Sequence, residues 1–399
     1  MRFCVVFNQF FNIMKRFSIF CLPAVVMAGA LLLASCGKDN STPAPAPTPE
    51  PAGPVDLSAK GTANCYIVSA PGTYSFKTTK GNSSVAVSVA AAEVLWESFG
   101  TETKPEVGDI IKSVSYADNR ITFTTPATLK NGNALIVAKD ESNQISWSWH
   151  IWVCEGYDPV AQGQVYNNEA GTMMDRNLGA TSATPGEVQA LGLMYQWGRK
   201  DPFLGSAQIG DRNKWAQSTL PWPAAQKSDE THGTIDFSIK NPTVFIKNND
   251  NNSDWYYSTP ETLNHDRWQS VKTIYDPCPT GWRVPDGGTN GIWMKAAGTA
   301  FSNLRNDLEK NCVHTSEVYG SATEIWYPVA GKIFNGELVQ ISTSTTALNY
   351  GFCWSCTPYG SGTSSYVFNF NVTAKETTSA TNAGSDSRAV AVSVRCCKE

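Results

Sequence analysis

The chain has 399 residues, with 31 Lys and Arg against 35 Asp and Glu, which gives a formal net charge of −4. Charged residues make up only 17% of the chain and form no basic block, so the composition argues against nucleic-acid binding. Aromatic residues reach 11%, and 31 Gly and 22 Pro supply many turns, a composition that favours strands and loops over long helices.

The first predicted element is an export signal. Lys15 and Arg16 precede a mostly apolar stretch over residues 17–33, which is the order of charge and apolar residues in a secretory signal peptide. Translation from Met14 would give a complete signal by itself, so residues 1–13 are left out of the expected fold.

The residues Leu33-Ala34-Ser35-Cys36 resemble the lipobox of bacterial lipoproteins, in which the cysteine thiol accepts a diacylglyceryl group. The alternative is a spanning helix, which needs roughly 20 apolar residues. Pro23 and the lipobox argue against it. We therefore expect a signal peptide over residues 1–35 and a lipid anchor at Cys36, which places the protein at the outer membrane, facing the cell surface.

Residues 36–56 are predicted to form a tether. Six prolines between residues 43 and 54 are separated by small residues. This spacing favours polyproline II, which extends the chain by about 3.1 Å per residue and would hold the folded part away from the membrane.

Short strand-like runs separated by turn residues fill residues 57–155. Their number and spacing, with the hairpin-like turns Asp118-Asn119 and Asn131-Gly132, predict an antiparallel β-sandwich. The predicted strands are 65–68, 73–76, 85–89, 110–116, 120–124, 134–138 and 145–153.

Residues 145–153 show the clearest strand pattern. Ile145, Trp147, Trp149, Ile151 and Val153 alternate with Ser146, Ser148 and His150, so apolar and polar side chains point to opposite faces. Because no second His or acidic residue lies at ligand spacing, we interpret His150 as a surface imidazole and not as a metal ligand.

Residues 156–399 have a different texture, rich in Gly, Asn and Trp and poor in periodic runs. Four motifs stand out: Met174 to Ala180, Tyr195 to Phe203, Asp276 to Pro285 and the closing Ser393-Val394-Arg395-Cys396. Together they resemble the Fibrobacter succinogenes major paralogous domain, found in many Bacteroidetes surface lipoproteins and fimbrillin-like proteins. The region before it, with Asn64 to Val68 and the Trp-rich strand, looks like the β-domain of fimbrillin-family proteins.

The resemblance implies a loop-rich α+β domain of the C-type-lectin-like kind over residues 156–399, with its ends brought together by a sheet. It also implies a disulfide between Cys278 and Cys396, because such folds bring late strands beside the middle of the domain. The expected fold class is thus a mainly β sandwich followed by a C-type-lectin-like domain.

Cysteine usage fits an exported protein. Of 11 cysteines, two lie in the predicted signal peptide and Cys36 would be lipidated, which leaves eight, an even number that favours disulfides. Cys353-Trp354-Ser355-Cys356 has the spacing of thiol-disulfide oxidoreductases, but Gly351 and Pro358 indicate a loop without a βαβ unit. Structural disulfides or unpaired thiols are favoured over redox chemistry, and no zinc site is assigned.

Residues 250–261 match a calcium-binding loop in part. Asp250, Asn252, Asp254 and Glu261 match four ligand positions of a helix-loop-helix calcium site, but Trp255 stands where a glycine is needed for the turn. The pattern favours a solvated Asn-rich loop, so we expect no cofactor, with calcium as the only candidate.

The remaining functional signal is aromatic. Trp255, Tyr256 and Tyr257 lie in a polar loop and could form a binding surface for a sugar or a protein, whereas Trp197, Trp282 and Trp293 are expected in the core. Hydrolase motifs such as G-x-S-x-G and H-E-x-x-H are absent, so no enzyme is expected. The sequence favours an adhesin or fimbria-associated protein that recognises glycan or host protein. The alternatives are a structural component that contacts fimbrial subunits and a cysteine-dependent oxidoreductase.

Overall fold

A computed structural model describes residues 53–248, 253–259, 262–298, 304–315, 324–341, 349–372 and 380–399. The predicted signal peptide, Cys36 and the tether up to residue 52 lie outside the described residues. The described part is a mainly β protein with several small mixed sheets and very little helix: α1 (Ile235–Lys240) and α2 (Ile292–Ala297) span six residues each. None of its helices has the length and apolar character that crossing a bilayer requires.

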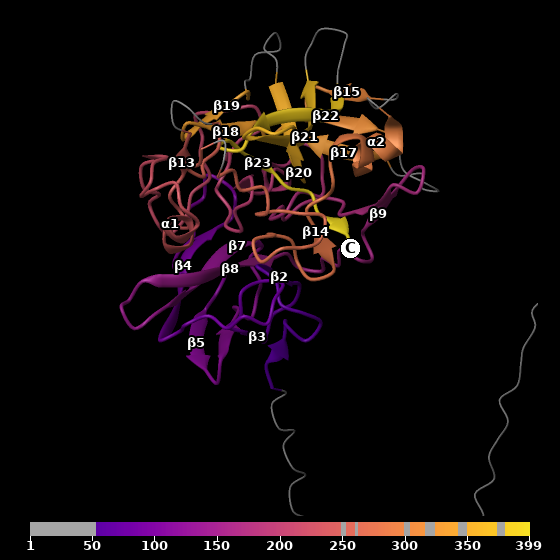
Figure 1. Cartoon of the computed structure of the whole chain (residues 1–399). Coiled ribbons are helices and arrows are strands. Elements are labelled where there is room, and N and C mark those ends of the chain that lie inside the picture. The colour runs from indigo at the N-terminus through magenta and orange to yellow at the C-terminus, as the bar shows by residue number, and fades with distance from the viewer. Residues whose placement is uncertain are drawn as a thin grey trace, which may run out of the picture. The chain divides into compact units, whose positions relative to one another are not determined.

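The first eight strands form two four-stranded sheets, in the orders β1-β3-β6-β5 and β2-β8-β7-β4. Figure 1 shows them in indigo and purple, with the long strands β7 and β8 side by side. Both sheets are mixed, because β1 pairs with β3 and β2 with β8 in parallel, where an antiparallel arrangement was expected. The strands are β1 (Val55–Asp56), β2 (Cys65–Val68), β3 (Thr73–Lys77), β4 (Ala91–Ser98), β5 (Ser113–Ala117), β6 (Arg120–Thr124), β7 (Gly132–Lys139) and β8 (Ile145–Val153).

Two strand predictions in this region are wrong, one in whole and one in its first residues. Residues 85–89 form no strand, and Val85 is more than half exposed. Residues 110–112 precede β5, because the backbone N–H groups of Ile110 and Ile111 donate to the buried carboxylate of Glu97. The strand β4 was not predicted, since a bulge between Val94 and Trp96 interrupts its alternation.

Strand β8 is buried on both faces. Trp147, Trp149 and Ile151 pack in a cluster that both sheets share, while Trp152 belongs to a second cluster formed with later parts of the chain. The expectation of a surface imidazole is therefore wrong. His150 is 1% exposed, its Nε2 lies 2.8 Å from the side-chain oxygen of Asn133, and burial lowers the pKa of the imidazole to about 3.

Packing continues across residue 155. The indole of Trp147 donates to the side-chain oxygen of Asn64, whose amide nitrogen donates to the carbonyls of Ile274 and Asp276. The second cluster joins residues from β2, β4, β7 and β8 to Trp197, Trp268 and the cysteine pair of the later region. Ser148 and His150 thus lie on the face of β8 opposite Trp147 and Trp149, as predicted, but later parts of the chain bury that face.

The later region is built around a seven-stranded sheet, ordered β19-β18-β23-β20-β21-β22 with β11 pairing β23. A small sheet, β14-β24-β10-β9, brings the first strands of this region beside its last. The first six strands here are β9 (Gln164–Tyr166), β10 (Gly171–Met173), β11 (Met194–Gln196), β12 (Gln226–Lys227), β13 (Ile246–Lys247) and β14 (Trp282–Arg283). The others are β15 (Arg305–Asp307), β16 (Cys312–Thr315), β17 (Ile325–Pro328), β18 (Lys332–Phe334), β19 (Glu337–Val339), β20 (Asn349–Tyr359), β21 (Ser364–Val372), β22 (Ala380–Ser387), β23 (Ala391–Ser393) and β24 (Cys397–Lys398).

Candidate functional site

The sequence motifs of the later region lie in the core. Trp197, Trp282 and Trp293 are buried, as predicted. The indole of Trp197 donates to the carbonyl of Ser355, and the buried guanidinium of Arg199 donates to backbone carbonyls around residues 238–244. These side chains fix the positions of long loops, because each satisfies backbone groups that would otherwise be buried without a partner.

One of the four candidate calcium ligands, Asp254, lies in a buried ion-pair cluster. Asp250, Asn252 and Glu261 lie outside the described residues. The carboxylate of Asp254 is 1% exposed and contacts both Arg267 and Arg388, with an Oδ1–Nη1 distance of 2.9 Å to Arg267. Two guanidinium groups therefore neutralise this buried carboxylate, which is part of an ion-pair cluster.

The predicted aromatic surface is only partly exposed. Trp255 is fully buried, and its indole donates to the carbonyl of Trp197 at 2.8 Å. Arg267 lies over its ring, 4.9 Å from the centroid. Tyr256 is half-buried, and Tyr257 has 38% of its surface exposed. Trp255 is therefore a core residue, which leaves Tyr257 as the exposed member of the three.

The structure joins Cys278 and Cys396, the pair that the resemblance implied. The other cysteines of the described chain are unpaired and buried, so the even count did not predict a larger set of disulfides. Cys353 and Cys356 lie in strand β20, not in a loop, and pack in different hydrophobic clusters. Burial raises the pKa of the Cys353 thiol to about 12, which is unfavourable for a redox nucleophile.

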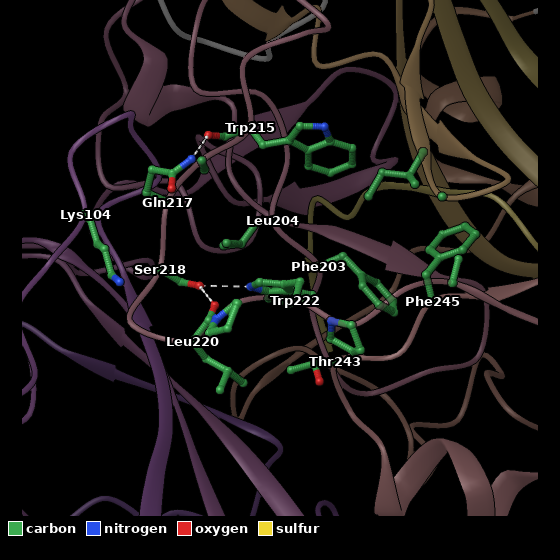
Figure 2. A pocket seen from close by; sticks show the side chains of 16 residues that line it. Lys104, Phe203, Leu204, Trp215, Gln217, Ser218, Leu220, Trp222, Thr243 and Phe245 are labelled. Atoms are coloured by element: carbon green, nitrogen blue, oxygen red, sulfur yellow. Dashed lines mark hydrogen bonds between the residues drawn. The ribbon is translucent and has the colours of Figure 1, made fainter.

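An aromatic cavity of about 440 Å³ opens elsewhere on the molecule (Figure 2). Its walls come from residues 203–225, from the segment before β13 and from the β18–β19 hairpin. This volume falls within the roughly 300–1,000 Å³ of small-molecule sites. We call it the aromatic cavity; its four rings belong to Phe203, Trp215, Trp222 and Phe245.

The rings of the aromatic cavity are held in place by their neighbours. Phe203 and Phe245 are buried and meet edge to face at 5.5 Å, while Trp222 is half-buried and lies 5.8 Å from Phe203. The indole N–H of Trp222 donates to Ser218 Oγ at 3.0 Å, as Figure 2 shows. A ring fixed before binding loses little conformational entropy when a ligand stacks on it.

The outer edge of strand β4 positions residues 217–219, which line the aromatic cavity or lie beside it. The backbone N–H of Thr219 donates to the carbonyl of Glu97, and the hydroxyl of Ser98 donates to the carbonyl of Gln217. Residues 217–219 therefore satisfy the free edge of β4, and Pro221 and Pro223 on either side of Trp222 restrict the chain that follows.

Polar side chains are few around the aromatic cavity. Gln217 is exposed at the rim, and Thr243 and Ser218 contribute hydroxyl groups. Among the 16 lining residues Lys104 carries the only charge, and none is an Asp or Glu. The cavity is thus suited to a neutral or weakly anionic ligand with one apolar face.

No family model, curated protein or solved structure matches this chain. The geometry of the site therefore carries the functional argument.

Sequence reasoning missed the aromatic cavity. Only Phe203, at the end of the motif Tyr195 to Phe203, belongs to one of the ordered motifs, and ordinary core packing explains the burial of Phe203 and Phe245. The usable signal was Pro221-Trp222-Pro223, in which a Trp lies in a segment too rigid and too short to bury it in a strand or a helix. Such a Trp tends to remain at the surface, where it can contact a ligand.

Proposed function

We propose that this chain is a lipid-anchored protein of the outer membrane that binds a glycan in the aromatic cavity, as an adhesin or fimbria-associated protein. The observation that carries the proposal is the pair of half-buried rings, Trp215 and Trp222, which line the cavity together with the buried rings of Phe203 and Phe245. Indole faces stack on the apolar faces of sugars, and neighbouring amide and hydroxyl groups accept or donate hydrogen bonds to sugar hydroxyls.

The lining favours binding over hydrolysis. Glycosidases generally need two carboxyl groups that flank the glycosidic bond, at separations of roughly 5–10 Å. The lining of the aromatic cavity contains none. A sugar held there would meet rings, one ammonium group and neutral polar groups, which suits recognition without turnover.

We further propose the finer fold: a β-sandwich over residues 57–155 and a C-type-lectin-like domain over residues 156–399. The shared cluster between the first two sheets supports the sandwich. The second part is supported by the pairing of Met173 in β10 with Cys397 in β24, which joins the beginning and the end of the later region.

Trp222→Ala should weaken glycan binding by roughly 30-fold or more, equivalent to about 2 kcal/mol, because the variant removes a preorganised stacking surface. The ligand is first selected on a glycan array with the full chain, and affinity is then measured by titration calorimetry. Gln217→Ala, at the exposed rim, should weaken binding less and leave the fold intact.

Tyr257→Ala is the matched control, because it removes an exposed aromatic ring outside the aromatic cavity. Binding by this variant should equal that of the wild type. Loss of binding in Tyr257→Ala with retention in Trp222→Ala and Gln217→Ala would place the ligand on the loop around Tyr257. An array without any hit, together with co-purification of fimbrial subunits, would favour a structural component.

Cys36→Ser should abolish membrane retention, since lipidation of this cysteine is the proposed anchor. Cell fractionation with detection of precursor and mature forms checks this. A variant that stays in the membrane fraction at full precursor length would mean that residues 17–33 span the membrane. Protease treatment of intact cells tests whether the anchored chain faces outward.

A further inference from the structure

A group of side chains that could bind a metal ion lies on the β15–β16 hairpin, and none of them lines the aromatic cavity. Asp307 in β15 is paired across the hairpin with Cys312 in β16. His314 lies two residues beyond Cys312 and therefore on the same face of the strand. One carboxylate, one thiol and one imidazole thus converge, with their ligand atoms all within 4.8 Å of one another.

The separations fit a common metal ion. Cys312 Sγ lies 3.4 Å from His314 Nε2, and that nitrogen lies 3.8 Å from Asp307 Oδ2. Metal–ligand distances of about 2.3 Å for sulfur and about 2.0–2.2 Å for nitrogen and oxygen place the ligands of a tetrahedral zinc ion roughly 3.3–3.6 Å apart. Small rotations of these side chains would complete the arrangement.

A fourth residue orients the imidazole. The carboxylate of Glu324 lies 3.3 Å from Nδ1 of His314, on the side of the ring opposite Cys312. Metal-binding histidines commonly donate their second N–H to a carboxylate in this way, because the contact fixes the tautomer and presents the other nitrogen to the metal. This contact is independent of the three-residue cluster and leaves Nε2 available as a ligand.

The surrounding charges are compatible with an ion. Asp307 Oδ1 accepts the backbone N–H of Lys310, which directs Oδ2 toward the cluster. The ammonium of Lys310 lies 3.2 Å from Oδ2 and would have to move away when a metal ion binds there. The Lys310 side chain is half exposed, so it is free to move into solvent. Arg305 pairs with Glu324 on the outside of the hairpin.

We propose that Asp307, Cys312 and His314 bind a divalent transition-metal ion of the zinc class, with Glu324 as a positioning residue. A thiol and an imidazole favour such an ion over calcium or magnesium, which prefer oxygen ligands. Three protein ligands leave one position for water. Asp307 is partly exposed and the His314 side chain keeps 11% of its surface accessible, so the ion can enter from the side of Asp307, whereas Cys312 forms the buried floor of the site.

The test is metal uptake by the full chain, purified in detergent and stripped with a chelator. We expect one zinc per chain by calorimetry and, with cobalt, a thiolate-to-cobalt charge-transfer band. Cys312→Ser, His314→Ala and Asp307→Asn should each weaken zinc binding by roughly 100-fold or more, and Glu324→Gln by about 10–100-fold. Cobalt bound to Cys312→Ser should lack the charge-transfer band.

Cys154→Ser is the matched control, because it removes a buried, unpaired cysteine elsewhere and should bind zinc like the wild type. Asp307→Asn preserves side-chain shape, so it remains informative where replacement of the buried Cys312 impairs folding. Absence of zinc uptake by the folded wild type, or uptake that Asp307→Asn and His314→Ala leave unchanged, would overturn the proposal.

Discussion

Cys278→Ser is expected to lower the melting temperature of the chain by on the order of 10 °C. The disulfide between Cys278 and Cys396 closes a segment in which the two residues are 118 positions apart. On the loop-entropy account, a closure of this length stabilises the folded state by about 4–5 kcal/mol, because it restricts the unfolded chain. That is a large share of a typical unfolding free energy of about 5–15 kcal/mol.

Calorimetry of the full chain under non-reducing conditions measures the effect, and peptide mapping establishes the bond. Cys397→Ser is the matched control, since Cys397 is adjacent to Cys396, is buried and is unpaired. It should change the melting temperature much less. Recovery of Cys278 as a free thiol, or linked to Cys312, would contradict the pairing and weaken the fold proposal with it.

Asp254→Asn is expected to reduce the free energy of unfolding by about 3–5 kcal/mol. The variant preserves the shape of the side chain but leaves Arg267 and Arg388, whose side chains are fully buried, without a counter-charge. A buried charge without its partner keeps its desolvation cost and loses the attraction that offset it. Burial already lowers the pKa of Arg388 to about 10.

Denaturant unfolding of the full chain measures this change. Asp236→Asn provides the control, because Asp236 pairs with Lys240 on the exposed face of α1 and such pairs contribute about 0–1 kcal/mol. Adding Arg388→Met to Asp254→Asn should recover part of the lost free energy of unfolding, since it removes one of the two buried guanidinium charges that Asp254→Asn leaves unpaired. Equal stability of Asp254→Asn and the wild type would show that the cluster contributes no net stabilisation.

Strand prediction succeeded where side chains alternate without interruption. The bounds of β2, β6 and β8 agree with the predicted runs, and the turn at Asp118 and Asn119 uses positive φ angles that these residue types tolerate. It failed at β4, where a bulge shifts the alternation, and at residues 110–112, where Glu97 takes the backbone N–H groups. Neither a bulge nor a distant acceptor leaves a period in the sequence.

The candidate sites were predicted less well than the strands. Trp255 was grouped with an exposed loop because its neighbours in sequence are polar, yet Arg267 and Trp197 cover it. His150 was expected at the surface because it alternates with apolar residues, yet a second layer of chain covers that face of β8. In both cases the decisive contacts come from residues far away in the chain.

By itself, the sequence determined the mainly β character of this protein and the core positions of Trp197, Trp282 and Trp293. These properties follow from composition and from local periodicity, which the backbone geometry of a strand imposes on neighbouring residues. Only the tertiary structure decided that Trp215 and Trp222 share a cavity with Phe203 and Phe245, and that Asp307, Cys312 and His314 meet on one face of a hairpin. Such groupings depend on long-range packing and on strand register, and a single sequence has no local pattern that records either.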